Sequence, residues 1–419
     1  KALLRSAELY HLMQNAGDFG LSANEITFDL EKIVKRSRDI AGQLNRGVKH
    51  LLKKNKVTVI EGEARLKAAG EVLVRAGGKP EVLLRAKNVI IATGARPREL
   101  DHLKADGKQI CTYKEAMTPE TLPKSLLVIG SGAIGMEFAS FYRDLGAEVT
   151  VVEVLDSILP VEDAEISALA AKSFERQGMT LLTSATVTRL VTGKAGVVAT
   201  IEPRDAKAGK NLKQTFERVI LAIGIEGNTE DLGLGGLGVE VARGHIQTDE
   251  WGATAVKGVW AIGDVTGPPW LAHKASHEGV ITVERIAGIE GLHPLDKSNI
   301  PGCTYCRPQI ASLGMTEEAA KKAGRKVRIG RFPYLANGKA IALGETEGLV
   351  KTIFDAKTGE LLGAHMIGAE VTELIQGYAI ARALETTEAE LMHTVFPHPT
   401  LSEMMHESVL SAFGRPLHI

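Results

Sequence analysis

A glycine-rich turn is the clearest sign of chemistry in this sequence. Residues 130–135 read Gly-Ser-Gly-Ala-Ile-Gly and lie between an apolar run at 126–129 and a helical pattern at 136–145. In such a turn the first glycine permits the tight bend, the second lets the backbone approach a pyrophosphate, and the third lets helix and strand pack closely. The turn predicts a dinucleotide site at a helix N-terminus, with a plain strand-to-helix turn as the alternative. The predicted site consists of Gly130, Ser131, Gly132, Ala133, Ile134 and Gly135.

Glu153 indicates which dinucleotide would bind. It ends the next apolar run, 149–152, about 20 residues beyond the turn, where an acid can hydrogen-bond both ribose hydroxyls. A carboxylate repels a 2′-phosphate, and the neighbours Val154 and Leu155 offer no arginine to receive one. The sequence therefore predicts NAD(H) rather than NADP(H).

The cysteines give a weaker signal. The chain has three, Cys111, Cys303 and Cys306, which argues against a disulfide scaffold and for a reducing compartment. Cys303 and Cys306 form a Cys-x-x-Cys pair, but one pair cannot complete a four-thiolate zinc site, so no metal site is predicted. We expect packed free thiols, with a reversible disulfide as the alternative.

The composition is that of an ordinary globular protein. The 419 residues are 44% hydrophobic and 24% charged, which is enough for about two to four domains. The 50 basic and 51 acidic residues leave a net charge of −1, so nothing favours nucleic acid or a membrane surface as a partner. No apolar run reaches the roughly 20 residues needed to span a bilayer.

Hydrophobic patterns divide the chain into regions. Residues 1–55 are mainly helical and include a basic amphipathic stretch at 28–54. Residues 126–177 alternate strand and helix with short loops, which predicts a right-handed parallel unit. Apolar runs ending in glycine occur three times, at 89–94, 219–224 and 258–263, and suggest two similar nucleotide-binding folds. The other predicted elements are strands at 57–60, 72–74, 82–84, 327–332, 340–343, 349–355 and 361–367, and a helix at 370–384.

Several motifs resemble those of two-dinucleotide flavoproteins. Thr93-Gly94 followed by Arg96-Pro97 resembles their ATG motif, and Ala261-Ile262-Gly263-Asp264 resembles their second flavin motif. Pro397-His398-Pro399-Thr400-Leu401-Ser402-Glu403 looks like the His-Pro-Thr-x-x-Glu signature of the disulfide reductases. Its Leu-Ser-Glu end is more similar to dihydrolipoamide dehydrogenases than to glutathione reductases. The motifs occur in the family's order along essentially the whole chain.

The resemblance implies an α/β, two-dinucleotide-binding flavoprotein fold with an inserted Rossmann-type NAD domain and a C-terminal α+β dimerisation domain. The implied domains are an FAD domain at 1–124 that lacks its N-terminal part, an NAD domain at 125–255, a return to the FAD domain at 256–298, and a dimerisation domain at 299–419.

The resemblance also assigns roles to particular residues. His398 is the expected acid/base, because a dithiol must lose a proton to attack a disulfide and imidazole titrates near neutral pH. Glu403 would orient the imidazole and stabilise the imidazolium. Lys1 and Glu137 would pair beside the flavin, although Glu137 is also simply an acid favoured near a helix N-terminus. The remaining implied cofactor contacts are Ala64, Thr93, Gly94, Ala95, Val187, Gly224, Asp264, Trp270, Leu271, Ala272 and His273.

The implied reaction is the NAD-dependent oxidation of dihydrolipoamide to lipoamide through FAD and a cysteine pair. The family's redox motif ends in lysine, so the pair and the first flavin loop would precede Lys1, and we expect the chain to be part of a longer protein. The implied partners are a second copy of the chain and the lipoyl-bearing acyltransferase subunits of 2-oxoacid dehydrogenase complexes. The location would be the bacterial cytoplasm or the mitochondrial matrix. A flavin-dependent transhydrogenase or another sister oxidoreductase, and a disabled truncated chain that only binds or dimerises, remain alternatives.

Overall fold

The computed structural model describes residues 1–78, 80–205 and 211–419, which form two compact units. Unit 1 comprises residues 1–40, 99–223 and 298–419, and unit 2 comprises residues 41–98 and 224–297. These units do not follow the domain boundaries proposed from the sequence, which stay a prediction. None of the helices described is long and apolar enough to cross a membrane.

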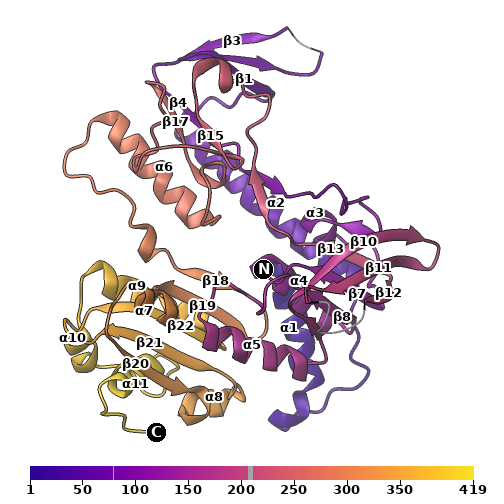
Figure 1. Cartoon of the computed structure of the whole chain (residues 1–419), viewed down its shortest axis with the longest axis vertical. Coiled ribbons are helices and arrows are strands. Elements are labelled where there is room, and N and C mark those ends of the chain that lie inside the picture. Colours follow the sequence, from indigo (N-terminus) through magenta and orange to yellow (C-terminus); the bar gives the residue numbers. More distant parts are fainter. Residues whose placement is uncertain (79, 206–210) are drawn as a thin grey trace. The chain divides into compact units, whose positions relative to one another are not determined.

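A five-stranded parallel sheet carries the predicted dinucleotide turn and forms the part of unit 1 that we call the nucleotide half (Figure 1). Its strands, in spatial order, are β6 (Ile110–Cys111), β13 (Arg218–Leu221), β7 (Ser125–Ile129), β8 (Glu148–Val152) and β9 (Thr180–Leu182). Helix α4 (Ala133–Asp144) joins β7 to β8, and α5 (Ala164–Arg176) joins β8 to β9. From β7 the chain continues to β8 and β9 on one side of the sheet, whereas the strand on the other side of β7 is β13, which comes later in the sequence. Such a reversal in strand order is a switch point, the place where open α/β sheets bind ligands. The predicted parallel unit is confirmed.

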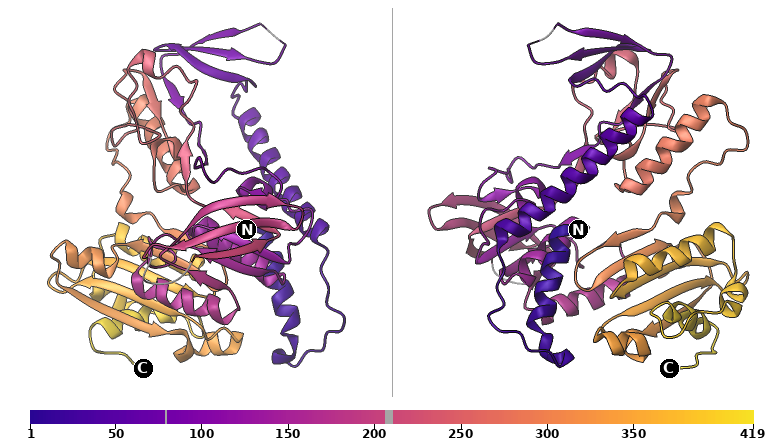
Figure 2. Two further views of the ribbon diagram at one scale, coloured as in Figure 1. Left: turned by 45° about the vertical axis from the view of Figure 1, so that its right-hand side comes forward. Right: turned by 180° about the vertical axis from the view of Figure 1, so that it is seen from behind.

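Both faces of the parallel sheet are covered. One face packs against α4, α5 and α1 (Ala2–Gln14), with Leu126, Val128 and Val151 in the shared core. The other face packs against a separate antiparallel layer of three strands, drawn in magenta to pink in Figure 2. The strands of this layer are β10 (Ala185–Gly193), β11 (Gly196–Pro203) and β12 (Leu212–Phe216). Because both faces are buried, the parallel strands are apolar along most of their length and do not alternate between apolar and polar residues.

The C-terminal part of unit 1 is a five-stranded antiparallel sheet with helices. Its strands, in spatial order, are β18 (Gly302–Thr304), β19 (Gln309–Gly314), β22 (Leu361–Gly368), β21 (Leu349–Asp355) and β20 (Val327–Pro333). Helices α9 (Val371–Ala383) and α11 (Glu403–Ala412) pack on one face through Ala364, Met366 and Val350. The shorter helical elements of unit 1 are η1 (Ala16–Phe19), α3 (Tyr113–Ala116), α7 (Glu317–Lys322), η5 (Tyr334–Ala336), α8 (Gly338–Leu343) and α10 (Glu388–His393).

Unit 2 contains smaller sheets. Strand β4 (Val89–Ile91) pairs in parallel with β17 (Val259–Ala261), and β5 (Ala95–Pro97) pairs antiparallel with β14 (Ile225–Gly227). The other elements are β1 (Glu63–Ala68), β2 (Glu71–Arg75), β3 (Val82–Arg85), η2 (Gly235–Leu237), β15 (Val241–Ala242), β16 (His245–Ile246), η3 (Gly263–Thr266) and α6 (Ala272–Ala287). Helix α2 (Leu30–Lys54) and η4 (Lys297–Asn299) each have residues in both units. Gly94, Gly224 and Gly263, which end the three repeated apolar runs, have φ of 71°, 107° and 77°.

Two strand predictions are wrong. Residues 57–60 form no strand, and Val57, Val59 and Ile60 are exposed, since none of the strands described pairs with them. Residues 340–343 belong to helix α8, not to a strand. The Asn337 side chain caps this helix by accepting a hydrogen bond from Ala340 N at 2.9 Å, and Gly344 ends it at φ 73°. An asparagine and a glycine that bracket a short apolar run are cap signals, and they outweigh the β-like pattern.

Asp355 organises the turn between β21 and β22. Its Oδ1 accepts hydrogen bonds from Lys357 N at 2.8 Å and Thr358 N at 3.0 Å, and its Oδ2 accepts one from Arg325 Nε at 2.7 Å. The bonds from Thr358 N–H and Lys357 N–H, followed by that from Arg325, lower the pKa of Asp355 from 3.8 to about 2.

We expect Asp355→Ala to lower the free energy of unfolding at neutral pH, because these three donors lose their acceptor. A carboxyl whose pKa is lower in the folded state stabilises the fold above its unfolded pKa and loses that effect as the pH falls through the folded pKa. The difference in unfolding free energy between wild type and variant should therefore shrink as the pH falls from 3.8 toward about 2. Urea unfolding across this pH range measures the difference, and a constant difference would contradict the prediction.

Candidate active site

The glycine turn has the geometry expected of a phosphate-binding turn. Gly130 has φ 98°, and a Cβ added there would lie 2.3 Å from Ala222 O. A Cβ on Gly135 would lie 2.0 Å from Gly130 O, so both glycines are required by the packing of the protein itself. At Gly132 an added Cβ would meet nothing within 4 Å. Gly132 caps α4 without any side-chain hydrogen bond, so the first N–H groups of the helix remain available for an anion.

Glu153 fastens this turn to the end of β8. Its carboxylate is buried, and its Oε2 accepts hydrogen bonds from Ser131 N at 2.9 Å and Ser131 Oγ at 2.7 Å. Its Oε1 accepts one from Leu155 N at 2.9 Å. The acid thus lies beside the turn at the switch point of the sheet, which is the position expected of a residue that binds the ribose. These residues fit a bound NAD.

The fold brings an arginine to this edge that sequence reasoning missed. Arg204 lies just after β11, and its guanidinium donates a hydrogen bond to Val154 O at 3.2 Å. The sequence neighbours of Glu153 contain no arginine, so only the pairing of β10 with β11 reveals this one.

Unit 2 assembles the predicted flavin motifs. Thr93 Oγ1 donates to Asn228 O at 2.8 Å, and Asn228 Nδ2 donates to Thr93 O at 2.9 Å, so the ATG segment and the segment after Gly224 are tied together. Asp264 lies in η3, and its carboxylate has no hydrogen bond or ion pair to the residues described. An acid with free acceptors at this point fits the ribitol of FAD.

The Lys274 side chain binds backbone carbonyl groups on both sides of Asp264. Lys274 is buried, and its Nζ donates to Gly263 O at 3.2 Å and Gly267 O at 3.0 Å, with Glu278 3.1 Å away. Sequence reasoning did not single out Lys274, although a lysine one turn into a helix beside a flavin motif was the available signal. Gly263 N in turn donates to Glu278 Oε2 at 2.8 Å.

The remaining predicted cofactor contacts lie in unit 2 and in the β10–β12 layer of unit 1. Trp270 is exposed and donates from Nε1 to His245 Nε2 at 3.3 Å, and Leu271 caps α6, whose first turn carries Ala272 and His273. Ala64 lies on β1 and Ala95 on β5. Val187 is 1% exposed in the core of the β10–β12 layer, so its side chain offers no surface to a cofactor.

Lys1 and Glu137 meet, as the resemblance implied. Lys1 Nζ forms an ion pair with Glu137 Oε1, which also accepts a hydrogen bond from Tyr305 N at 2.9 Å. The same ammonium lies 4.0 Å from the centre of the Tyr305 ring. Glu137 therefore does more than complement the dipole of α4: it joins α1 and the residues before β19 to that helix.

His398 and Glu403 also form the expected pair. His398 Nδ1 lies 2.9 Å from Glu403 Oε1, and Glu403 Oε2 accepts a hydrogen bond from Thr400 N at 2.9 Å. Burial by itself would raise the pKa of Glu403, but the hydrogen bonds from Thr400 and His398 outweigh it and leave that pKa below its usual value. The carboxylate stays ionised next to the imidazole, whose side chain is 78% exposed.

The cysteines are free thiols. Burial raises the pKa of Cys303 to about 11 and also raises those of Cys306 and Cys111. Cys303 packs against the core of the C-terminal sheet and Cys306 belongs to the core around α4. Thiols with raised pKa values are poor nucleophiles. No group of three or more potential metal ligands occurs among the residues described.

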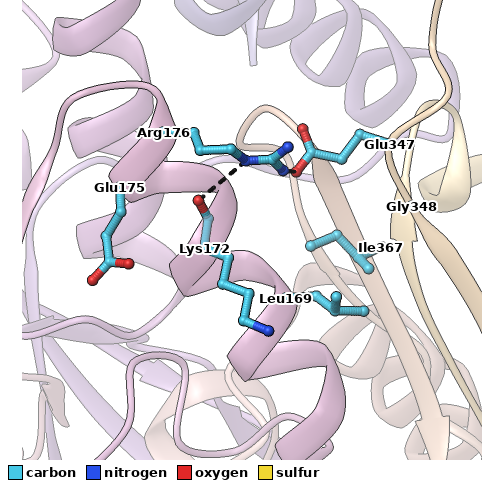
Figure 3. A pocket seen from close by; sticks show the side chains of 7 residues that line it. All are labelled: Leu169, Lys172, Glu175, Arg176, Glu347, Gly348 and Ile367. Atoms are coloured by element: carbon cyan, nitrogen blue, oxygen red, sulfur yellow. Dashed lines mark hydrogen bonds and ion pairs between the residues drawn. The ribbon is translucent and has the colours of Figure 1, made fainter.

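A separate cavity of about 660 Å³ lies between α5 and the adjoining ends of β21 and β22 (Figure 3). Leu169 and Ile367 give it apolar walls, and an ion pair between Arg176 and Glu347 crosses it. None of its lining residues belongs to the predicted sites, so we assign it no part in the chemistry.

Comparison with protein families and known proteins identifies the group to which this chain belongs. Residues 1–279 match the pyridine nucleotide-disulphide oxidoreductase family, and residues 300–409 match the dimerisation domain of the same family. A dihydrolipoyl dehydrogenase of Zymomonas mobilis is 57% identical over 418 residues, which are 100% of this chain and 89% of that protein. The chain belongs to the dihydrolipoyl dehydrogenase family. A dihydrolipoyl dehydrogenase of Rhizobium etli is 55% identical, again across 100% of this chain and 89% of the relative.

Solved structures agree on the fold. LpdA from Mycobacterium tuberculosis superposes with a TM-score of 0.89 at 28% identity, covering 98% of this chain and 88% of that one. The flavoprotein disulfide reductase RclA from Escherichia coli, in a copper complex, gives a TM-score of 0.85 at 23% identity, with 98% and 88% covered. The expected α/β two-dinucleotide fold with a dimerisation domain is therefore confirmed, and the family uses FAD and NAD.

The glycine turn yields a test that separates packing from binding. Gly132→Ala should leave the melting temperature nearly unchanged, because the methyl group enters open space, yet it should weaken binding of ADP-ribose by about tenfold or more where the pyrophosphate approaches. Gly135→Ala should instead lower the melting temperature by several degrees, because its methyl group would overlap Gly130 O. Calorimetric titration and thermal unfolding of both variants measure the two effects. Normal ADP-ribose affinity in the folded Gly132→Ala variant would count against the nucleotide role of the turn.

Proposed function

We infer that this chain catalyses the NAD-dependent oxidation of dihydrolipoamide to lipoamide, with FAD as resident cofactor. The pairing of His398 with Glu403 inside the dimerisation domain carries the inference, because a hydride-transfer flavoprotein without dithiol chemistry has no need of this acid/base pair. The identity to dihydrolipoyl dehydrogenases over the whole chain supports the same substrate.

The reaction removes two electrons and two protons from the dithiol, and it delivers a hydride to NAD and a proton to solvent. Bound FAD would supply the two-electron carrier between the two substrates. With the Nδ1 proton of His398 donated to Glu403, its Nε2 is free to accept the thiol proton as the thiolate attacks a disulfide. Glu403 then stabilises the imidazolium. The disulfide that is attacked would be the redox cysteine pair implied by the family resemblance.

The cofactor residues divide between the two units. In unit 1 the Gly130–Gly135 turn would hold the NAD pyrophosphate and Glu153 its ribose. In unit 2 the Thr93–Gly94 segment and Asp264 would contact the flavin. Lys1 and Glu137 would place a paired charge beside the flavin edge. These assignments follow from the motifs and from the geometry of each unit taken by itself.

The dimerisation domain makes a homodimer the working form of the protein. We propose that the 78% exposed imidazole of His398 is covered in that dimer, where the family resemblance places it opposite the flavin of the second subunit. We also propose that the dimer serves the lipoyl-bearing acyltransferase subunits of a 2-oxoacid dehydrogenase complex, in the compartment where those complexes work.

His398→Gln tests the proposed chemistry, and the chain supplies a matched control. His418 Nδ1 lies 2.7 Å from Glu407 Oε1, so it forms a second histidine–glutamate pair in the same domain. In the intact gene product, His398→Gln should lower kcat/KM for dihydrolipoamide by about 10²–10⁴, the usual loss for an acid/base residue. His418→Gln should leave kcat/KM close to that of wild type. Reduction of ferricyanide by NADH, which needs no thiol proton transfer, should survive in both variants.

Two outcomes would contradict the proposal. Equal activity of His398→Gln and wild type with dihydrolipoamide would remove the acid/base role. Wild-type protein that transfers hydride between NADH and an NAD analogue, but does not oxidise dihydrolipoamide, would make the chain a transhydrogenase instead.

A further inference from the structure

A row of polar side chains crosses the C-terminal sheet on the face opposite α9 and α11. Arg331 pairs in register with Lys351, Lys351 with His365, and His365 with Ser312, on four neighbouring strands. The apolar residues between them point to the other face and form the core with the helices. Polar side chains on a sheet face that is largely covered need partners, and Glu165 of α5 and the N-cap residue Asp163 supply two of them.

Lys351 is the centre of this row. Its side chain is 3% exposed, and Nζ lies 2.8 Å from Asp163 Oδ1, 2.9 Å from Glu165 Oε2 and 2.7 Å from Glu317 Oε2. An ammonium has three donors, and here each one meets a carboxylate. Arg331 adds hydrogen bonds from Nε to both carboxylate oxygens of Glu165, at 2.8 Å and 3.0 Å.

The charges in this cluster support one another. Burial alone would lower the pKa of Lys351, but the three carboxylates outweigh it and raise that pKa above its usual value. For Asp163 burial would raise the pKa, yet Lys351 and Glu317 N–H outweigh it and lower it. All four groups are therefore ionised at neutral pH. Removing the ammonium would leave the buried carboxylate of Asp163 and the half-buried ones of Glu165 and Glu317 facing one another without this counter-ion, which is costly.

Asp163 connects the ion cluster around Lys351 to the nucleotide half. Its Oδ1 also accepts a hydrogen bond from Glu165 N at 3.1 Å and so caps α5, while its Oδ2 accepts one from Glu317 N at 3.1 Å. Asp163 is also the last residue of the loop that begins after Glu153 and runs to α5. The sheet thus fixes one end of that loop, and Glu153 fixes the other.

Within the loop, Leu159 contacts the glycine turn directly. Leu159 N donates a hydrogen bond to Ser131 O at 3.1 Å, and Leu159 O accepts hydrogen bonds from Ser167 Oγ at 3.0 Å and Glu162 N at 2.9 Å. Leu159 is 1% exposed and has φ 48°, a conformation that a leucine adopts only where its surroundings force it. The loop therefore binds the carbonyl of Ser131, while Glu153 binds its N–H and hydroxyl groups.

We propose that Lys351 of the dimerisation domain is a positioning residue for the nucleotide turn, which it supports through Asp163 and the Leu159–Ser131 hydrogen bond. On this basis a residue outside the nucleotide-binding half sets the affinity for NAD(H). The proposal rests on the proposed function only in naming NAD(H) as the nucleotide. Lys351 touches neither cofactor nor substrate, so its effect is on binding and not on the chemical step.

The test uses the intact, flavin-loaded protein and two measurements. ADP-ribose carries the phosphates and ribose hydroxyls of NAD without a nicotinamide to be reduced, and calorimetric titration gives its Kd. Lys351→Met should raise this Kd, and the KM for NAD, by about threefold to tenfold, the equivalent of one lost hydrogen-bonded anchor. The KM for dihydrolipoamide should stay unchanged. Lys351→Arg, which keeps the charge, should recover much of the affinity.

A matched control comes from the far end of α5. Arg176, the last residue of α5, and Glu347, just before β21, form another ion pair (Figure 3). The hydrogen bonds and ion pairs described for these two side chains do not involve the loop 154–163. Arg176→Gln should therefore leave the ADP-ribose Kd unchanged. If Lys351→Met fails to fold, Ser167→Ala releases Leu159 O without disturbing the ion cluster, and it should raise the Kd in the same direction.

The outcomes separate this inference from the proposed function. Unchanged ADP-ribose affinity in folded Lys351→Met and Ser167→Ala would overturn the inference while leaving lipoamide turnover intact. An equal rise in KM for both substrates would also overturn it, because it would show a general structural defect. Wild-type protein that binds ADP-ribose but does not oxidise dihydrolipoamide would refute the proposed function, and the Kd values would still test Lys351.

Discussion

The close backbone approach at the turn after β7 is the constraint on which the nucleotide half depends. Gly130 N bonds Val152 O at 2.9 Å on one side, and Ala222 N bonds Ile129 O at 2.8 Å on the other. The turn is therefore fixed between β8 and β13, where there is no room for a Cβ at Gly130. This fixes the start of α4, and its free N–H groups then point out of the carboxyl edge of the sheet.

Helix α4 carries that constraint into the rest of unit 1. Its Glu137 accepts from Tyr305 N, and its Asp144 accepts from Arg307 Nη2 at 2.7 Å, so one face of the helix organises the chain that leads into β19. The cluster around Lys351 makes a second junction, between α5 and the same sheet. The nucleotide half and the dimerisation sheet are thus joined by buried or half-buried charges that are each paired, as burial of charge requires.

The histidine–glutamate pairs show what geometry alone leaves open. His398–Glu403 and His418–Glu407 have nearly the same separation, 2.9 Å and 2.7 Å, and both histidines are largely exposed. Each carboxylate also accepts a backbone hydrogen bond, Glu403 from Thr400 N at 2.9 Å and Glu407 from Leu417 N at 3.1 Å. What distinguishes the two pairs is the sequence around His398, which has a proline on either side. The two pairs have similar geometry, so the sequence motif is what identifies His398 as the candidate acid/base.

The sequence by itself determined the local elements with strong periodicity and the residues with family signatures: the Gly130–Gly135 turn, Glu153, Asp264 and the His398–Glu403 pair. These depend on neighbours a few residues apart, so spacing reveals them. It misassigned 57–60 and 340–343, because a short apolar run becomes a strand only if another strand lies beside it. Only the tertiary structure decided that Arg204, Lys274 and Lys351 lie where they do, since each meets its partners through strand pairing or helix packing. From the sequence alone a lysine in a strand, such as Lys351, is expected to face solvent. The fold buries this one because it places three carboxylates around its ammonium group.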